Sequence, residues 1–256
     1  MAKGLPGIPL QDRLIVALDL PESDAIELVG KLQPSVNTFK VGLQLIVSSG
    51  GMGVVERLGE LGARVFLDLK MFDIPETVIQ SLNQIQTRHR HIVFTTIHAF
   101  SRGLEGALKF RDASNSLKIL VVTLLTSMDH TDLTDIGIEK NVMDFVMAQT
   151  RRAADAGCDG VIASGLEAKV IRKEFENLLI VTPGIRPAWA QVPNDDQKRV
   201  TTPREAIING ADYLVIGRPI YRNPLGNDPR EAVRRILDEI AAAIDERDAS
   251  SASAVG

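Results

Sequence analysis

The chain has 256 residues, 45% of them hydrophobic, and a formal net charge of −4. This composition can fill a sizeable core and excludes the strongly basic balance of a general nucleic-acid-binding protein. The single cysteine, Cys158, excludes an internal disulfide and a cysteine-based zinc site. No apolar run reaches membrane-spanning length, and the first residues lack a signal-peptide core. We therefore expect a soluble, cytoplasmic protein.

Eight short apolar runs, most of them rich in Val and Ile, recur along the chain and predict strands. Nearly continuous apolar runs are typical of parallel strands that are covered on both faces. The runs are Leu14–Leu20, Thr38–Leu43, Arg64–Lys70, Ile92–Ala99, Lys118–Leu125, Gly160–Ser164, Leu179–Ile185 and Tyr213–Gly217.

Segments with helical patterns separate the apolar runs. They carry capping residues, terminal glycines, or apolar side chains three to four residues apart, and Pro229–Ile244 has the clearest apolar face. The predicted helices are 23–30, 53–61, 75–86, 144–156, a helix capped by Thr202 with Pro203 in its first turn, and 229–244.

Eight strands that alternate with helices predict a single (β/α)8 TIM barrel over residues 1–247. An open, doubly wound sheet is the alternative, and the eight-unit count favours the barrel. Residues 248–256 are rich in Ala and Ser, and we expect them to form a disordered tail. Residues 186–200 form the one long irregular segment, which is typical of a lid or a binding loop.

Charged side chains follow the first three predicted strands, where the working face of such a barrel lies. They are Asp19, Lys40, Asp68, Lys70 and Asp73. Each taken singly is explained by an ordinary ion pair at a strand end. Because adjacent strands carry them together, a shared site is the better interpretation. Carboxylates around a lysine keep its amine protonated, which suits proton delivery or stabilisation of charge on carbon better than Schiff-base formation.

A second pattern follows the seventh and eighth predicted strands. Arg186 ends the segment Thr-Pro-Gly-Ile-Arg, and Gly217 and Arg218 lie in Ile-Gly-Arg-Pro. Loops at these places in a barrel commonly bind phosphate, although a plain turn explains either motif taken alone. Thr126 and Ser127, at the end of the fifth predicted strand, offer hydroxyls to a ligand or to a helix cap. His98 is either a core or rim histidine with its hydrogen bonds satisfied or a general base.

The segment Asp68–Pro75 resembles the Asp-x-Lys-x-x-Asp-Ile-Pro signature of the orotidine 5′-phosphate decarboxylase family, in its bacterial type 1-like form. The resemblance covers almost the whole chain. The other matching segments, in the family's order, are Asp19 in Val-Ala-Leu-Asp, Lys40 in Phe-Lys-Val-Gly, Thr126 in Leu-Leu-Thr-Ser, Pro183–Arg186, Gln197 and Val215–Pro219.

The resemblance implies decarboxylation of orotidine 5′-phosphate to UMP, the last step of pyrimidine biosynthesis, with no cofactor and no metal. It implies that Lys70 protonates C6, that Asp68 lies beside the departing carboxylate, and that Asp73 reaches the neighbouring site of a homodimer. The remaining implied contacts are Asp19 and Lys40 to the ribose, with Lys40 also in the charge network, Thr77 and Thr126 to the substrate, and Arg186, Gln197, Gly217 and Arg218 at the phosphate end.

Two positions depart from the resemblance: Phe72 stands where many relatives have His, and Glu76 where they have Asn. Two other functions compete with the decarboxylase hypothesis. One is a magnesium-dependent sister enzyme acting on a keto-hexulose phosphate, and the other is a non-catalytic protein that binds a phosphate ligand. The irregular segment with Gln197 argues against the first, and Lys70 beside Asp68 argues against the second.

Overall fold

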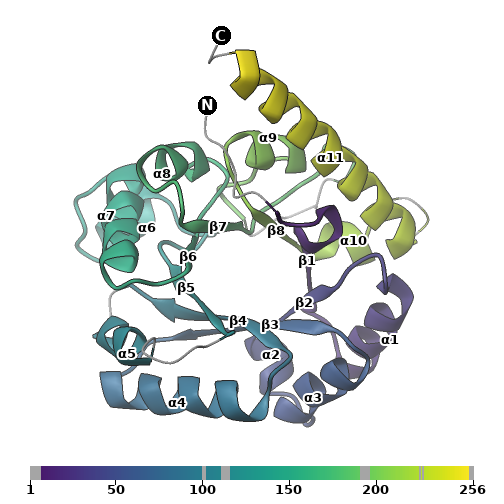
Figure 1. Ribbon diagram of the computed structural model, residues 1–256, viewed down its shortest axis with the longest axis horizontal. Coiled ribbons are helices and arrows are strands. Elements are labelled where there is room, and N and C mark those ends of the chain that lie inside the picture. The colour runs from purple at the N-terminus through teal and green to yellow at the C-terminus, as the bar shows by residue number, and fades with distance from the viewer. Residues whose placement is uncertain are drawn as a thin grey trace.

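The computed structural model describes residues 7–99, 102–110, 116–190, 197–224, 226 and 228–253. Eight parallel strands close into a barrel in the order β1 to β8, each hydrogen-bonded to its neighbours in sequence and β8 to β1. Figure 1 shows this ring from one end, with the helices arranged around it. The predicted (β/α)8 barrel is confirmed, and the open doubly wound sheet is excluded.

All eight predicted strands are present, most of them ending earlier than their apolar runs. They are β1 (Leu14–Ala17), β2 (Thr38–Val41), β3 (Arg64–Met71), β4 (Ile92–His98), β5 (Lys118–Val122), β6 (Gly160–Ile162), β7 (Leu179–Thr182) and β8 (Tyr213–Ile216). The helical elements are η1 (Leu10–Asp12), α1 (Glu22–Leu32), α2 (Leu43–Ile46), α3 (Met52–Glu60), α4 (Pro75–Arg88), α5 (Gly103–Phe110), α6 (His130–Asp135), α7 (Val142–Asp155), α8 (Ala168–Glu174), α9 (Pro203–Ile208), α10 (Arg218–Tyr221) and α11 (Pro229–Ser253).

The core has two layers because alternate strand side chains face opposite sides. Side chains inside the barrel include Ile15, Phe66, Phe94, Leu120 and Val215, all nearly buried. Phe66 and Phe94 meet edge to face at a centroid distance of 5.9 Å. The other strand faces pack against the surrounding helices and form the larger cluster. This filled interior leaves room for a site only at the ends of the barrel.

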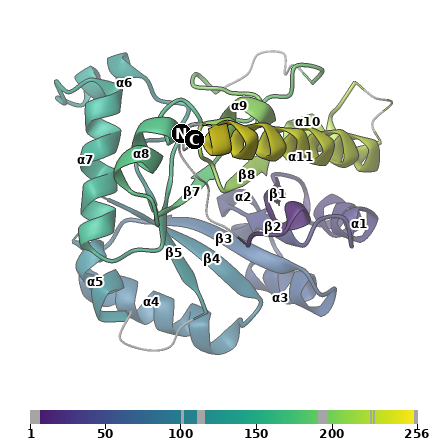
Figure 2. The ribbon, with the colours of Figure 1, turned by 45° about the horizontal axis from the view of Figure 1, so that its top comes forward.

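Helix boundaries follow from local capping. Thr202 and Glu205 form a capping box at the start of α9, and Pro203 lies in its first turn, as the sequence predicts. The last helix, α11, continues to Ser253, past residue 247 where we expect a disordered tail to begin. It packs against α9, α1 and α10, and Figure 2 shows it lying across one side of the barrel.

A buried ion pair lies at the amino-terminal ends of β7 and β8. The Arg172 guanidinium bonds to the Asp212 carboxylate, and both side chains are fully buried. Arg172 also donates to carbonyl oxygens of Glu176, Leu178 and Gly210. Because it satisfies this many acceptors at the end opposite the predicted site, we assign the pair a structural role.

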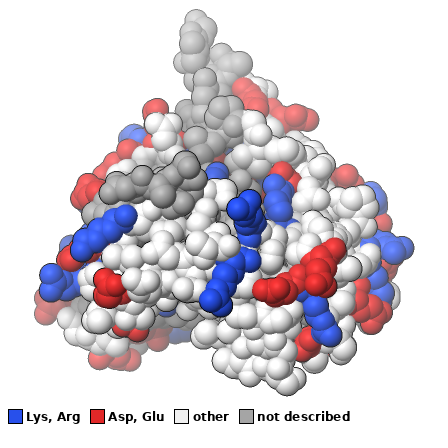
Figure 3. All heavy atoms as spheres, turned by 60° about the horizontal axis from the view of Figure 1, so that its bottom comes forward, with Lys and Arg blue, Asp and Glu red and all other residues white. Residues whose placement is uncertain are grey.

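The surface carries both signs of charge, in keeping with the composition. On the face shown in Figure 3, basic and acidic side chains are interspersed with neutral surface. Within the described part of the chain, no helix combines the length and the apolar character needed to cross a bilayer.

Candidate active site

The end of β3 is irregular, and this irregularity shapes the site. The pairing of β3 with β4 shifts register between Leu67 and Met71. Within that shift Lys70 has a φ of 49°, the one positive φ at a non-glycine residue among those described. A side chain is rarely tolerated in this left-handed region, and such strain concentrates at functional sites. The bulge at the end of the strand therefore determines the direction in which the Lys70 side chain points.

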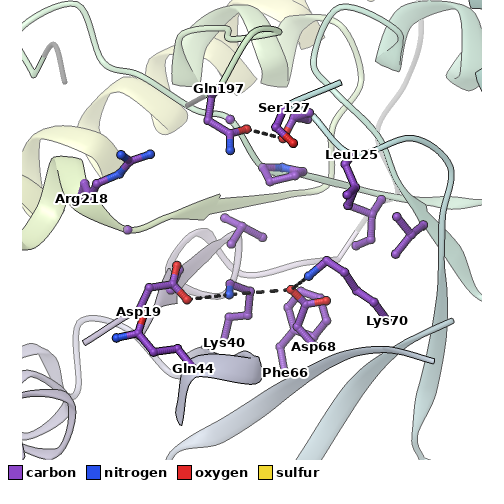
Figure 4. Close-up of a pocket in the computed structure, with 18 of the residues that line it drawn as sticks. Asp19, Lys40, Gln44, Phe66, Asp68, Lys70, Leu125, Ser127, Gln197 and Arg218 are labelled. Atoms are coloured by element: carbon purple, nitrogen blue, oxygen red, sulfur yellow. Dashed lines mark hydrogen bonds and ion pairs between the residues drawn. The ribbon is translucent and has the colours of Figure 1, made fainter. Parts of the chain in front are cut away.

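Four charged side chains from the first three strands form a continuous row, which Figure 4 shows along one wall of a pocket. Lys40 Nζ lies 3.1 Å from Asp19 Oδ1 and 3.7 Å from Asp68 Oδ2. Lys70 Nζ lies 2.6 Å from Asp68 Oδ2. The signs thus alternate from Asp19 to Lys70, as the sequence predicts. Gly42 makes room for this row, since a Cβ there would lie 3.1 Å from Lys40 Nζ.

Thr96 on β4 completes the network and is absent from the sequence-based prediction. Its hydroxyl donates to Asp68 Oδ1 at 2.8 Å and accepts the backbone N–H of Lys70 at 2.8 Å. One buried hydroxyl therefore fixes both the carboxylate and the strained backbone beside it. Nothing in the local sequence distinguishes Thr96 from Thr95, which lies within the same strand.

The electrostatics favour an ionised Asp68. Burial raises its pKa, but Lys40, Lys70 and the hydrogen bonds from Lys70 and Thr96 more than offset burial, so the pKa lies below its ordinary value. Burial and the nearby Lys70 charge lower the pKa of His98. His98 does not line the pocket and stacks edge to face on Phe72 at 6.0 Å. This placement supports the rim histidine of the two interpretations.

The pocket has a volume of about 510 Å³, and the other charged side chains that line it lie near the ends of β7 and β8. Arg186, Gly217 and Arg218 line it there, as the sequence predicts, and Tyr221 and Arg222 line it as well. Figure 4 shows Arg218 and Lys70 toward opposite sides of the pocket. A side chain at Gly217 would approach Ala17 and the Tyr221 hydroxyl, each at 3.3 Å. Glycine there leaves backbone open to a ligand.

Thr126 and Gln197 meet at the rim of the pocket. The Thr126 hydroxyl donates to the Gln197 side-chain carbonyl oxygen, and both residues line the pocket. The long segment 186–200 is closed at its base by a parallel bridge between Ile185 and Thr201. Residues 191–196 of the predicted lid lie outside the described part of the chain.

Two predicted site residues, Asp73 and Thr77, do not lie in the pocket. Both side chains are exposed and neither is among the residues that line the cavity. The Asp73 carboxylate accepts the backbone N–H of Ile74 at 2.7 Å. The neighbouring apolar side chains Phe72 and Ile74 are 66% and 64% exposed, which is unusual for large apolar residues side by side.

Three polar residues that line the pocket are absent from the sequence-based prediction: Gln44, Tyr221 and Arg222. Gln44 lies on the short helix α2, two residues after Gly42. Its nearness in sequence to the predicted site residue Lys40 is the one available signal. Tyr221 and Arg222 lie at the end of α10, where proximity to Gly217 and Arg218 is the equivalent signal.

Comparison with known proteins decides the family. The model of the "Orotidine 5′-phosphate decarboxylase / HUMPS family" matches residues 12–236. The chain belongs to this family. It is 45% identical over 235 residues to the orotidine 5′-phosphate decarboxylase of Methylococcus capsulatus, covering 91% of this chain and 93% of that protein.

Two further relatives agree with this assignment to the family. The orotidine 5′-phosphate decarboxylase of Nitrobacter winogradskyi is 45% identical over 236 residues, covering 91% of this chain and 95% of that one. The crystal structure of the enzyme from Lactobacillus acidophilus matches with a TM-score of 0.72 and 33% identity, covering 90% of this chain and 99% of that chain. The family predicted from the segment Asp68–Pro75 is therefore confirmed.

Proposed function

We propose that the protein decarboxylates orotidine 5′-phosphate to UMP without a cofactor, with Lys70 as the acid that protonates C6. Membership of the family and the alternating row of Asp19, Lys40, Asp68 and Lys70 in one pocket support this activity. The observation that carries the mechanism is the Lys70 ammonium held 2.6 Å from a buried carboxylate, because this contact fixes a proton donor at one point of the pocket.

The proposed chemistry uses that proton once in each turnover. The bond between C6 and the carboxylate carbon breaks, CO2 departs, and the electron pair stays on C6. The Lys70 ammonium stabilises this developing charge electrostatically and then transfers its proton to C6. UMP leaves, and the neutral amine takes a proton from water. Asp68 orients the ammonium through the short contact and is itself held by Thr96.

The rest of the pocket suits a nucleoside monophosphate. Asp19 and Lys40 would hold the ribose hydroxyls, and Arg186, Arg218 and the backbone at Gly217 would hold the phosphate. Thr126 and Gln197 lie together at the rim and would contact the ligand between these regions. Contacts to the phosphate lie away from the reacting carbon, and their binding energy can order the segment 186–200 over the substrate.

We also propose a homodimer in which Asp73 and Thr77 act in the partner's site. The support is that both residues are exposed and neither lines its own pocket, while Phe72 and Ile74, which flank Asp73, are largely exposed. An isologous interface would cover these apolar side chains and bring each Asp73 to the other pocket. Such an enzyme would serve the last step of UMP synthesis in the cytoplasm.

The deciding experiment follows the loss of pyrimidine absorbance when the protein is mixed with orotidine 5′-phosphate in excess EDTA. Rapid loss supports both the substrate and the independence from metal. Activity that requires magnesium and acts on a keto-hexulose phosphate instead would move the protein to the sister enzymes. Absence of turnover on either substrate would overturn the proposal.

A further inference from the structure

Arg199 is a buried cation at the end of the segment 186–200, and no role in the site has been assigned to it. Its Nη1 lies 2.7 Å from Glu167 Oε1, and the two side chains are 7% and 3% exposed. Its Nη2 donates to the carbonyl oxygens of Leu124 and Leu125, each at 3.0 Å. Arg199 thus joins the end of β5 to the turn between β6 and α8.

Backbone contacts tie the same place down from the other side. The N–H groups of Lys198 and Arg199 both donate to the carbonyl oxygen of Thr126, each at 3.2 Å. The Ser164 hydroxyl donates to the Arg199 carbonyl oxygen at 3.1 Å, and the Ser164 N–H donates to Glu167 Oε2 at 2.9 Å. The chain at 198–199 is therefore fixed against three successive residues, Leu124 to Thr126.

Stability alone is a weak reason for such a pair. Desolvation of two charges commonly cancels their attraction, so apolar residues of similar size often stabilise a fold equally well. Burial raises the pKa of Glu167 in spite of Arg199 and the N–H of Ser164, which shows the cost of ionising this carboxyl. What apolar residues cannot supply is a planar fork that bonds a carboxylate and two carbonyl groups at once.

Gln197 lies two residues before Arg199, and its side chain contacts the Thr126 hydroxyl at the rim of the pocket. Arg199 and Glu167 do not line the pocket themselves. We propose that Arg199, held by Glu167, is a positioning residue that fixes Gln197 over the substrate. The Arg199–Glu167 pair fixes the end of the segment 186–200 in place and so determines where the side-chain amide of Gln197 lies. This inference rests on the proposed function for its activity readout.

Lys198 provides a matched control because it is the adjacent cation in an ion pair of a different kind. Its ammonium lies 2.9 Å from both Asp129 and Asp132, at the start of α6, and all three side chains are more than a third exposed. Exposed pairs of this kind contribute little and are screened by solvent. Lys198→Ala should change kcat/KM by less than about twofold.

The test is a double-mutant cycle between Arg199→Met and Gln197→Ala, with kcat and KM measured on orotidine 5′-phosphate. In the wild-type background Arg199→Met should lower kcat/KM about tenfold or more, chiefly through KM. In the Gln197→Ala background the same change should cost less than about twofold, because the amide it positions is gone. Arg199→Lys, which keeps the charge and loses the fork, should recover part of the activity.

Equal losses in the two backgrounds would overturn the proposal, since a purely structural role does not act through Gln197. Thermal unfolding checks that each variant is folded. If Arg199→Met does not fold, Glu167→Gln takes its place in the cycle and decides in the same way. The same cycle measured as affinity for UMP separates the two proposals. If the wild type binds UMP without turnover, coupling between Arg199 and Gln197 in UMP affinity supports the positioning role and its absence overturns it. A wild type that neither binds UMP nor turns over substrate overturns both proposals.

Discussion

The Lys70 ammonium lies 2.6 Å from the carboxylate of Asp68, which is two residues earlier on the same strand, and the backbone at Lys70 is left-handed. In a regular strand, two residues at these positions point to the same face and their Cα atoms lie about 7 Å apart. Here the bulge, the positive φ and the bond from Thr96 place both groups at one point of the pocket. The charge arrangement is therefore a property of the backbone as much as of the side chains.

Lys70→Ala should lower kcat by about 10⁴-fold or more while the barrel remains folded. The variant loses both the proton donor and the fixed positive charge beside the reacting carbon. Absorbance assays with single turnovers measure the loss, and circular dichroism checks the fold. Lys118→Ala, an exposed lysine at the opposite end of a strand, is the control and should keep full activity. Normal turnover by Lys70→Ala would remove Lys70 as the acid.

Lys70→Gly should be more stable than Lys70→Ala by about 1 kcal/mol. Glycine adopts a φ of 49° without the clash that any Cβ produces. This order reverses the ordinary strand preference, in which glycine is the weaker residue. Urea unfolding of the two variants, both lacking the ammonium, isolates the backbone contribution. A more stable alanine variant would show that the strand end relaxes when the lysine is removed.

Thr96→Val should destabilise the fold by about 1–3 kcal/mol and lower kcat, because it leaves the N–H of Lys70 without its acceptor and removes the hydroxyl donor to Asp68 Oδ1. Thr96→Ser keeps the hydroxyl and should retain most of both properties. Thr95 offers a matched control on the same strand: its buried hydroxyl has no hydrogen-bond partner among the described residues. Thr95→Val should therefore leave the free energy of unfolding and kcat unchanged. Equal effects at the two positions would contradict the assignment of Thr96.

The stabilising contribution of Asp68 should depend on pH. A carboxyl whose pKa is lower in the folded than in the unfolded chain stabilises the fold above its unfolded pKa, about 3.9. That contribution disappears as the pH falls through the folded value. The pKa of Asp68 is lowered, since Lys40, Lys70 and Thr96 outweigh burial. The difference in unfolding free energy between wild type and Asp68→Asn should thus be largest near neutral pH and shrink below about pH 4. A difference that does not vary with pH would contradict it.

Mixing Asp73→Ala with Lys70→Ala subunits should restore activity if the site is shared. Each variant alone lacks one part of every site, whereas a hybrid dimer contains one complete site. Random exchange of equal amounts makes half of the dimers hybrids, so about a quarter of wild-type activity should return. Subunit exchange is verified by tagging one variant. No recovery after proven exchange would place Asp73 outside the neighbouring site.

The sequence was sufficient to predict the barrel because each buried strand is a short apolar run with Gly, Pro or charged residues at its borders. It was less informative about short elements. The helices α2 and α10 have four residues each, too few for a 3.6-residue period to be detectable. The helix α11 continues to Ser253. The residues after 247 are mostly small or polar, so no apolar face indicates a helix there.

The candidate site divides in the same way. Charges at strand ends were visible because they interrupt apolar runs, and Asp19, Lys40, Asp68 and Lys70 indeed meet. Thr96 was invisible because a threonine inside a β-strand is ordinary, and its role arises from the register of β3 against β4. Glu167 and Arg199 lie 32 residues apart, so only the closed barrel brings them together.

The bridge between Ile185 and Thr201 joins the two ends of the segment 186–200 at one place on the rim. The entropic cost of closing a loop grows only slowly with its length, by about 0.6 kcal/mol for each doubling. The part of the segment between Ala190 and Gln197 can accordingly be lengthened, shortened or exchanged with that of a relative while the barrel stays intact, provided that Arg199 and its contacts are kept. Ligand preference can thus diverge through this one exchangeable module, without any change to the charges at the ends of β1, β2 and β3.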